Sequence, residues 1–240
     1  MAEKIILASG KGGVGKSSLT AGLAVALCNL GAKVLVIDFD IGMGCLDLIL
    51  ASDDTGIFNW GDIVSENCEP DSALRSTIGP QLLVAPQKFD ETFTSENIKK
   101  LIEHFDGEFD YILFDSPAGV SGGFLLAAEC ADRAIIVSTP DEVCVRVGCY
   151  TAEKLSELGI DDVKLVINRF NKALTVQGHY LNIDEVIDAT YLQLLGIIPE
   201  DKKLSYCSVI GMQSLEKSSA KSAFLRIARR LEGVNVPLKI

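Results

Sequence analysis

A glycine-rich stretch near the N-terminus constrains the fold of this chain more than any other feature. It reads Gly10-Lys11-Gly12-Gly13-Val14-Gly15-Lys16-Ser17 and fits the pattern G-x-x-x-x-G-K-[ST]. An apolar run at residues 4–8 precedes it and predicts a buried strand, and a helical pattern follows it. In that context backbone N–H groups can wrap a phosphate chain, the lysine reaches the phosphates and the hydroxyl binds Mg²⁺. The stretch therefore predicts a phosphate-binding loop that opens a helix.

The same glycines also satisfy a second pattern, the G-x-G-x-x-G of dinucleotide-binding folds. Gly10, Gly12 and Gly15 have that spacing, and the acid Asp38 follows at about the distance where such folds bind a ribose. A dinucleotide fold, however, has no use for an ammonium and a hydroxyl at the start of the helix. The Lys-Ser pair therefore favours the phosphate loop, both over a dinucleotide loop and over a glycine-rich turn without a ligand.

Lys11 gives the loop a second lysine. The stretch from Lys11 to Ser18 resembles the deviant phosphate loop of the ParA/MinD family of ATPases. The resemblance implies a homodimer that sandwiches ATP, in which Lys11 reaches the phosphates of the partner and Lys16 those of its own subunit. The phosphate-binding residues that it implies are Gly10, Lys11, Gly12, Gly13, Val14, Gly15, Lys16, Ser17 and Ser18.

Two acids follow the second predicted strand, in the stretch Asp38-Phe39-Asp40-Ile41-Gly42. Carboxylates that leave the carboxyl end of a strand beside a phosphate loop are well placed for Mg²⁺-bound water and for the attacking water. We expect Asp38 to hold the metal through water, and Asp40 to orient the attacking water within reach of the metal. The alternative is that the two acids only cap the next helix.

The region around these acids resembles one branch of the family more than the rest. Residues 36–42, followed by Leu46-Asp47-Leu48, look like the switch I region of the MinD branch, the bacterial septum-site ATPases. Members of the family commonly carry Arg-Asn before Leu-Asp-Leu, whereas this chain has Gly44-Cys45. The resemblance therefore does not carry the contacts of the Arg-Asn pair over to this chain.

A third acid, Asp115, ends the apolar run at 111–114 and precedes Ser116-Pro117-Ala118-Gly119. Such a strand can place its carboxylate beside the phosphate loop, where it holds Mg²⁺ through water. The alternative is an acid that ends a buried strand by chance. The stretch resembles the switch II region of the family, which implies that the N–H of Gly119 senses the γ-phosphate. The expected metal set is Ser17, Asp38, Asp40 and Asp115.

Two later strand ends match the places where the family holds adenine. The resemblance implies that Asn168 reads the adenine edge, because its amide offers a donor and an acceptor to N6 and N7, and that Arg169 and Pro199 pack on the ring faces. The nucleotide-binding residues that the resemblance adds to the loop are Asp141, Asn168, Arg169, Pro199, Glu200 and Asp201. Val147 departs from the family pattern, since it replaces an acid that could pair with Lys11 or serve a partner-binding face.

The order of the predicted elements indicates an α/β fold. Apolar runs predict strands at 33–38, 82–86, 111–115, 133–138, 163–168 and near 196–199, and helical patterns lie at 19–30, 96–105 and 143–158. The pattern at 19–30 predicts an amphipathic helix that Gly31 ends. Strands that alternate with helices predict a doubly wound, mostly parallel twisted sheet with helices on both faces, as in P-loop NTPases. No linker-like stretch divides the 240 residues, so we expect a single domain over 1–240, with a loop and a short helix at 51–80.

The last helical pattern, at 220–231, carries apolar residues at helical spacing and basic residues on its other faces. It could lie on a membrane surface or dock on the sheet, and we favour docking because three of its six apolar positions are alanine. MinD proteins usually continue past a Val-Pro-Leu signature into a basic amphipathic helix, whereas this chain stops at Ile240. We therefore expect no autonomous membrane anchor at the C-terminus, and recruitment to a membrane only through a partner.

Charge and cysteine content favour a cytoplasmic protein. The formal net charge of −11 opposes direct binding to nucleic acid or anionic lipid, and no signal peptide or transmembrane run is found in the sequence. The seven cysteines lack a C-x-x-C pair and predict buried thiols in a reducing compartment. The alternative, a metal pair of Cys144 and Cys149 at a dimer interface, suffers from a five-residue offset that fits neither face of a helix.

Together these resemblances imply a MinD-like ATPase. It would bind ATP and Mg²⁺, form a homodimer through ATP, and hydrolyse ATP slowly to ADP and phosphate in order to place the division septum. A related role in metal-centre maturation, or in the positioning of flagellar, chromosomal or other cargo, remains the alternative, as does a nucleotide-bound scaffold without turnover. A stimulating or effector protein is expected in each case, and the sequence does not identify it.

Overall fold

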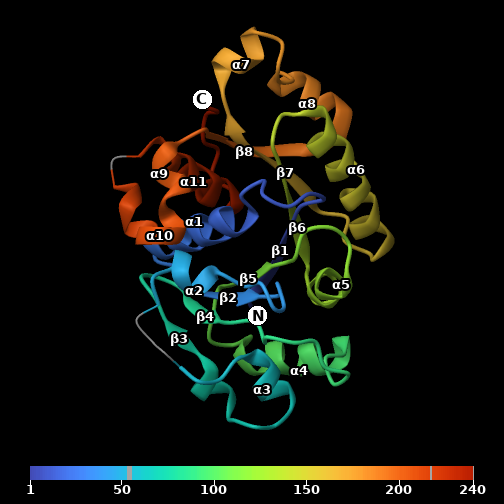
Figure 1. Ribbon diagram of the computed structural model, residues 1–240, viewed down its shortest axis with the longest axis vertical. Coiled ribbons are helices and arrows are strands. Elements are labelled where there is room, and N and C mark those ends of the chain that lie inside the picture. The colour runs from blue at the N-terminus through green and yellow to red at the C-terminus, as the bar shows by residue number, and fades with distance from the viewer. Residues whose placement is uncertain (53–55, 217, 240) are drawn as a thin grey trace.

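An eight-stranded sheet runs through the centre of the computed structural model, which describes residues 1–52, 56–216 and 218–239 (Figure 1). Its order is β3-β4-β2-β5-β1-β6-β7-β8, and every neighbouring pair is parallel except β3 and β4. The strands are β1 (Glu3–Ala8), β2 (Val34–Asp38), β3 (Arg75–Ser76), β4 (Gln81–Leu83), β5 (Tyr111–Asp115), β6 (Arg133–Ser138), β7 (Val163–Phe170) and β8 (Gln193–Pro199).

Helices cover both faces of this sheet, and two hydrophobic clusters fill the space beneath them (Figure 1). One face carries α1 (Lys16–Asn29), α2 (Leu46–Ile49), α9 (Lys202–Ser205), α10 (Cys207–Ile210), the short 3-10 turn η2 (Met212–Leu215) and α11 (Ser219–Leu231). The other carries α3 (Trp60–Val64), α4 (Ser95–Phe105), α5 (Gly122–Ala128), α6 (Glu142–Glu157) and α8 (Ile183–Thr190). The 3-10 turn η1 (Pro70–Ala73) follows α3, and α7 (Lys172–Val176) follows β7. The predicted doubly wound, mostly parallel fold is thereby confirmed.

The short elements are where the prediction fell short. The predicted strands and the long helices at 96–105, 143–158 and 220–231 are all present, but α2, β3, α5 and the helices between β7 and α11 were not predicted. These helices have four to eight residues and carry too few apolar positions for a periodic signal. The predicted loop at 51–80 does contain the short helix α3, and residues 53–55 of that stretch lie outside the described residues.

Helix α1 is buried more completely than its sequence predicted. An amphipathic helix with one buried face was expected, but the side chains from Leu19 to Ala24 are all buried. The reason is that α11 covers the side of α1 that does not face the sheet, as Gly22 shows: a Cβ there would lie 2.4 Å from the Phe224 ring. The expected end of α1 is confirmed, because Gly31 follows it with a φ of +98°.

Helix α11 docks on the protein core, as we favoured from its alanines. Its apolar residues are buried, and it packs against α1 and the edge strand β8. The glycine Gly196 in β8 makes the close approach possible, since a Cβ there would lie 2.4 Å from the Ile227 side chain. In the part of the chain that the structure describes, no helix is long and apolar enough to span a bilayer.

Candidate functional site

The glycine-rich loop lies where β1 ends and α1 begins, at the carboxyl edge of the sheet. Gly13 and Gly15 have φ values of +79° and +92°, which place them in the left-handed region that side chains disfavour. Gly15 is also crowded, because a Cβ there would lie 2.3 Å from the amide nitrogen of Asn168. The predicted strand, loop and helix are therefore confirmed, and Lys16 stands in the first turn of α1.

Lys16 and Asp115 form a buried ion pair at this edge. The Lys16 ammonium lies 2.8 Å from Asp115 Oδ1, and the two side chains are 7% and 1% exposed. The hydroxyl of Thr20, one turn along α1, lies at hydrogen-bond distance from the same Oδ1, 2.8 Å away. These contacts fix the carboxylate in one orientation, and its second oxygen, Oδ2, is buried without a hydrogen-bond partner.

Asp38 stands next to Asp115, because the two residues are paired in register between β2 and β5. Burial raises the pKa of Asp38 to about 7, and the neighbouring charge of Asp115 adds to this effect. Asp38 Oδ1 accepts the N–H of Asp40, at 2.9 Å, so the loop after β2 folds back over the carboxylate. Asp40 is half-buried, and burial raises its pKa, whereas the positive charge of Lys16 acts in the other direction.

These carboxylates fit a magnesium ion that is shared with phosphate. Magnesium prefers oxygen ligands and is usually held by one or two carboxylates together with substrate phosphates and water. The unpartnered Asp115 Oδ2 is a buried acceptor of the required kind. Within the described ranges no three His, Cys, Asp or Glu side chains form a metal cage of their own, so the ion would depend on the phosphates. Ser17, Asp38, Asp40 and Asp115 remain its expected neighbours.

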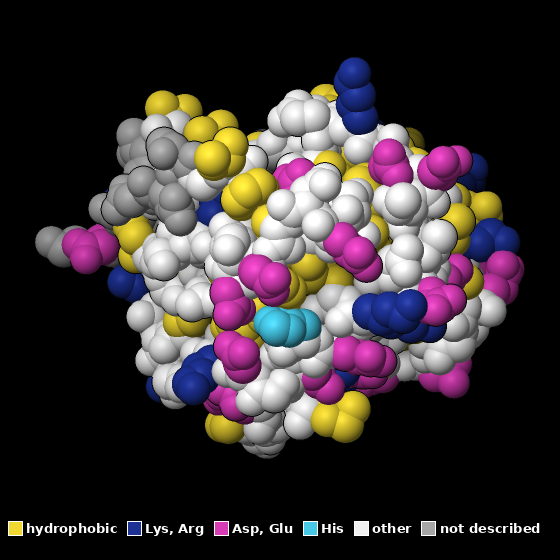
Figure 2. All heavy atoms as spheres, turned by 90° about the horizontal axis from the view of Figure 1, so that it is seen from below, with side chains coloured by type: hydrophobic (Ala, Val, Ile, Leu, Met, Phe, Trp, Pro, Cys, Tyr) yellow, Lys and Arg dark blue, Asp and Glu magenta, His cyan; other side chains and the backbone are white. Residues whose placement is uncertain are grey.

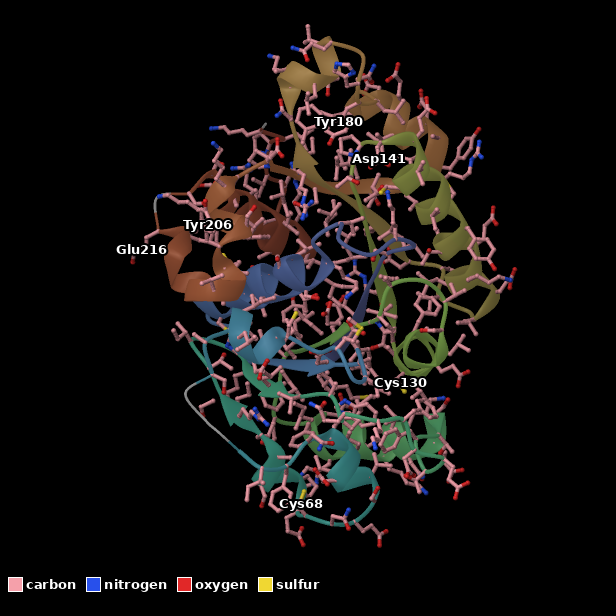
Figure 3. The ribbon with its side chains drawn as sticks, viewed as in Figure 1. Cys68, Cys130, Asp141, Tyr180, Tyr206 and Glu216 are labelled. Atoms are coloured by element: carbon pink, nitrogen blue, oxygen red, sulfur yellow. The ribbon has the colours of Figure 1, made fainter. Side chains whose placement is uncertain are left out.

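Lys11 lies outside this buried cluster. Its side chain is exposed, and among the described residues it forms no ion pair within 4 Å. Asp141 is the acid that it influences: burial alone would raise the Asp141 pKa, but hydrogen bonds and the Lys11 charge hold it below the usual value. Asp141, labelled at the start of α6 in Figure 3, caps that helix through the N–H of Cys144 and accepts the Thr139 hydroxyl. This capping bond gives Asp141 a structural role beside the predicted one.

A cavity of about 290 Å³ opens on the other side of the loop. It brings together the residues predicted from the two later strand ends, and its lining consists of Gly15, Ser18, Asn168, Arg169, Pro199, Glu200, Asp201, Leu204 and Ser205. The structure thus brings these residues together beside the phosphate loop, and their contact with adenine stays a prediction.

Asn168 also supports the phosphate loop. One side-chain N–H donates to the Val14 carbonyl of the loop, at 2.7 Å. The amide oxygen Oδ1 is buried without a partner. One of the two N–H groups of the amide is therefore used by the loop, and Oδ1 remains as an acceptor for a ligand. A base with an amino group on the facing edge fits this acceptor, and a carbonyl oxygen does not.

The acids that line the cavity are already engaged within the chain. Glu200 accepts a hydrogen bond from Asn171, at 2.7 Å. Asp201 accepts from the N–H of Lys203 through Oδ1, and from the Ser218 hydroxyl through Oδ2, at 2.8 Å. Asp201 thus ties the strand end to the start of α11, a use of the carboxylate that the sequence did not reveal. Arg169 is exposed and has a φ of +53°.

Three positions that were singled out in the sequence have clear surroundings. The Gly119 N–H donates to the Ser9 carbonyl, at 2.9 Å, so it is not free for the phosphate sensing that was predicted. Val147 packs against the phosphate loop, since a Cβ on Gly10 would lie 2.2 Å from its Cγ1. Gly44 lies directly on Asp38, and a Cβ at Gly44 would be 2.6 Å from Asp38 Oδ2. A larger residue at Gly44 therefore could not share this loop conformation.

Three of the seven cysteines, Cys130, Cys144 and Cys207, are buried as predicted, whereas the other four are partly exposed. None of the seven forms a disulfide, and Cys68 and Cys130 lie well apart in Figure 3. Cys149 donates to the Ala189 carbonyl, at 3.3 Å, whereas Cys144 is buried beside Thr139 and Asp141. Burial raises the pKa of both thiols, which disfavours the thiolate form that binds metals.

Two contributors to the site were missed in the sequence. Thr20 bonds to Asp115, and the indole N–H of Trp60 donates to the Asp38 carbonyl at 2.7 Å. A threonine inside an otherwise apolar helix, one turn after the loop lysine, was the available signal for Thr20. No local sequence signal indicated that Trp60 contacts β2, because the contact depends on how α3 packs against the sheet.

Known proteins resemble this chain in both sequence and fold. The family model for the CobQ/CobB/MinD/ParA nucleotide binding domain matches residues 5–213. The septum site-determining protein MinD of Synechocystis sp. is 35% identical over 240 residues, covering 97% of this chain and 90% of that protein.

Solved structures agree with the sequence comparison. The MinC:MinD cell division protein complex of Aquifex aeolicus contains a chain with a TM-score of 0.89 and 34% identity, covering 100% of this chain and 99% of that one. The septum site-determining protein MinD of Pyrococcus horikoshii, complexed with Mg-ADP, has a TM-score of 0.86 and 26% identity, covering 97% of this chain and 96% of that one.

Proposed function

Because this chain belongs to the MinD/ParA family of nucleotide-binding ATPases, we propose that it binds ATP with Mg²⁺, forms a homodimer around it and hydrolyses it to ADP and phosphate. The observation that carries the proposal is the unpartnered, buried Asp115 Oδ2 beside Lys16 at the start of α1. A buried acceptor without a partner costs about 1–3 kcal/mol, so a fold that keeps one has a use for it. A magnesium-bound water would supply the missing donor.

Each charged residue of the site has a task in this proposal that follows from its chemistry. Lys16 stabilises the phosphates of its own subunit, while the exposed Lys11 is free to reach across a dimer. Asp40 orients the attacking water, since it lies just beyond β2 and is only half-buried. When bound, Mg²⁺ neutralises charge on the phosphate oxygens. The water oxygen bonds to the γ-phosphorus, the bond to the β–γ bridging oxygen breaks, and a proton leaves with the phosphate product.

The base preference supports ATP rather than GTP. Asn168 lines the cavity, and its Oδ1 is a buried acceptor without a hydrogen-bond partner. The 6-amino group of adenine can donate to this oxygen, whereas the 6-oxo group of guanine would face it as a second acceptor. Arg169 and Pro199 line the same cavity and provide its walls.

Three measurements on the purified chain test this proposal. Fluorescent-nucleotide titration should show ATP binding that weakens when EDTA removes Mg²⁺. Light scattering should show a dimer with ATP and Mg²⁺ but a monomer with ADP, and phosphate release should be slow but measurable. Binding without any phosphate release would identify a nucleotide-bound scaffold, and absence of binding would reject the proposal.

We further propose a cytoplasmic role in septum placement, supported by the MinD relatives. The Aquifex relative was solved with MinC, and a protein partner of that kind would read the ATP dimer of this chain. Pull-down with a hydrolysis-deficient, ATP-bound form tests for such a partner. Because the apolar face of α11 is buried against α1 and β8, the purified chain should not pellet with anionic vesicles when ATP is added. ATP-dependent pelleting would show that α11 undocks.

A further inference from the structure

Charge is distributed unevenly along this acidic chain. Residues 200–240 contain eight Lys or Arg and four Asp or Glu, whereas residues 1–199 contain fourteen and twenty-nine. Figure 2 shows the acidic excess over the end of the molecule that carries α3 and α4, where magenta side chains predominate. Among the described residues of 200–240, no basic side chain forms an ion pair within 4 Å. The surface that α11 belongs to therefore has positive charge that the fold itself does not neutralise.

Two of these basic residues flank an apolar groove between α1 and α11. Lys221, Leu225 and Arg229 are spaced four residues apart, so they form one stripe along α11. They line a cavity of about 860 Å³ together with Val25 on α1 and Ile78 before β4. Ile78 is 41% exposed, and buried Phe224 and Leu215 contribute to the lining.

The groove continues beyond Ile78. A second cavity of about 870 Å³ shares Val25, Asn29 and Ile78 with the first and follows the C-terminal half of α1. The other two arginines of α11 that could compete for a ligand face away from it. Arg230 donates to the Leu195 and Val236 carbonyls, and Arg226 to the Lys239 carbonyl. One exposed acid, Glu216, lines the first cavity and lies at the outer edge of this layer (Figure 3).

Shape and charge together define what fits this groove. A helix is about 10–12 Å across and rises 5.4 Å per turn, roughly 500 Å³ per turn, so 860 Å³ admits the inward half of about three turns. A bilayer requires apolar side chains that protrude, whereas these lie in a hollow. Nucleic acid binds to basic residues that follow its phosphate backbone, and it has no row of apolar groups that could pack on the apolar residues of this groove. A helix with one apolar face and acidic residues beside it fits both the apolar residues that line the groove and the basic residues at its edge.

We propose that the groove between α1 and α11 (the α1–α11 groove) is a docking site for an acidic amphipathic helix of a partner protein. Apolar residues at positions i, i+3 or i+4, and i+7 of that helix would pack on Val25, Leu225 and Ile78. Glu or Asp beside them would pair with Lys221 and Arg229. The groove lies on the flank of α1, away from the loop that precedes its first turn, so docking does not require the nucleotide.

The test uses a displayed library of random 16-residue peptides, selected against the immobilised full chain without nucleotide. Enriched peptides should carry the acidic amphipathic pattern and bind in fluorescence polarisation, and added salt should weaken them. The double variant Lys221→Glu/Arg229→Glu should weaken binding at least ten-fold, and Ile78→Ser should weaken it several-fold. Lys99→Glu/Lys172→Glu changes the net charge equally at two exposed sites outside the groove, and should leave affinity unchanged.

Four outcomes would overturn the proposal. The first is that selection yields no binder, or only basic or extended ones. The second is that acidic helices bind equally well to both double variants. The third is that the chain binds anionic vesicles or DNA, and that Lys221→Glu/Arg229→Glu weakens this binding but not the binding of peptides. This result would assign the surface to a membrane or nucleic acid. The fourth is nucleotide-free self-association in sedimentation velocity that the same variant abolishes, which would make the occupant a second copy. Unchanged ATP binding by each variant shows that the fold is intact.

Discussion

At the phosphate end of the site the charged groups are buried and bonded to one another, whereas at the base end they lie near the surface and bond to neighbouring loops. The phosphate end consists of Lys16, Thr20, Asp38 and Asp115, none of which is more than 7% exposed. At the base end Arg169 and Glu200 are exposed, and only Asn168 is fully buried. The same chain thus builds one half of a site into its core and the other half onto its rim.

The difference bears on what a mutation can do. A buried ion pair that loses one partner leaves an uncompensated charge, so changes at the phosphate end affect folding and chemistry together. At the base end the groups are partly solvated, and a change can alter ligand preference or local stability separately. Variants in the two regions should therefore differ in whether stability and nucleotide affinity fall together.

The largest effect is expected at the buried lysine. Lys16→Ala should abolish measurable ATP binding, a loss of at least about 10²-fold, because the ammonium that meets the phosphates is gone. It should also lower the free energy of unfolding by about 3 kcal/mol, since Asp115 loses its buried partner. Nucleotide titration and urea unfolding measure the two losses.

Lys11→Ala is the matched control, because Lys11 belongs to the same loop but is exposed. Its free energy of unfolding should change by less than about 0.5 kcal/mol, and ATP binding should remain detectable, while the ATP-dependent dimer is lost. An ATP-dependent dimer of Lys11→Ala in light scattering would refute the proposal that Lys11 contacts the phosphates of the partner subunit. Lys99→Ala, on the exposed side of α4, should still dimerise.

Asp40→Ala should lower turnover by about 10²-fold, the scale expected for one positioned general base. ATP binding should persist, because Asp40 is only half-buried and Lys16, Asp38 and Asp115 remain in place. The variant should therefore accumulate as an ATP-bound dimer in light scattering. Asp40→Asn keeps the shape without the charge and should be as slow as the alanine variant. Phosphate release at the wild-type rate in either variant would show that a group other than Asp40 orients the attacking water.

The sequence predicted where the residues of the phosphate end lie, because they belong to a motif and to strand ends. The glycine pattern fixed the loop, and parallel strands necessarily bring Asp38 and Asp115 to the same edge. The Thr20 contact was not predicted, because it depends on the rotation of α1 over β5. At the base end the bond from Asn168 to Val14 joins residues 154 positions apart, and no local pattern encodes it.

Asn168 separates base recognition from support of the loop. Asn168→Ala should lower the preference for ATP over GTP about ten-fold, or about 1.4 kcal/mol, because the acceptor Oδ1 is lost. Asn168→Asp keeps an acceptor toward the base but places a second one against the Val14 carbonyl. It should retain the preference while both nucleotides bind more weakly. Competition titrations measure these ratios, and equal preference in wild type and Asn168→Ala would refute the assignment.

The smallest effect is expected at Asp201, where stability should change without affinity. Its carboxylate caps α9 and the start of α11, so Asp201→Asn should cost about 1–2 kcal/mol of unfolding free energy at pH 7. Burial alone would raise the Asp201 pKa, but hydrogen bonds from Ser218 and its neighbours hold it below the usual value.

A carboxylate with a lowered pKa in the folded state stabilises the fold above its unfolded pKa of about 4, and this contribution is lost as the pH falls through the folded pKa. Urea unfolding should therefore show a constant gap between wild type and Asp201→Asn from about pH 5 to pH 8, which shrinks below about pH 4. ATP affinity should stay within about three-fold of wild type, since the carboxylate is taken by Ser218 and Lys203. A ten-fold loss of ATP affinity with unchanged stability would instead make Asp201 a direct ligand of the nucleotide. The acids at the base end would then bind the nucleotide directly, as is proposed for the buried acids at the phosphate end.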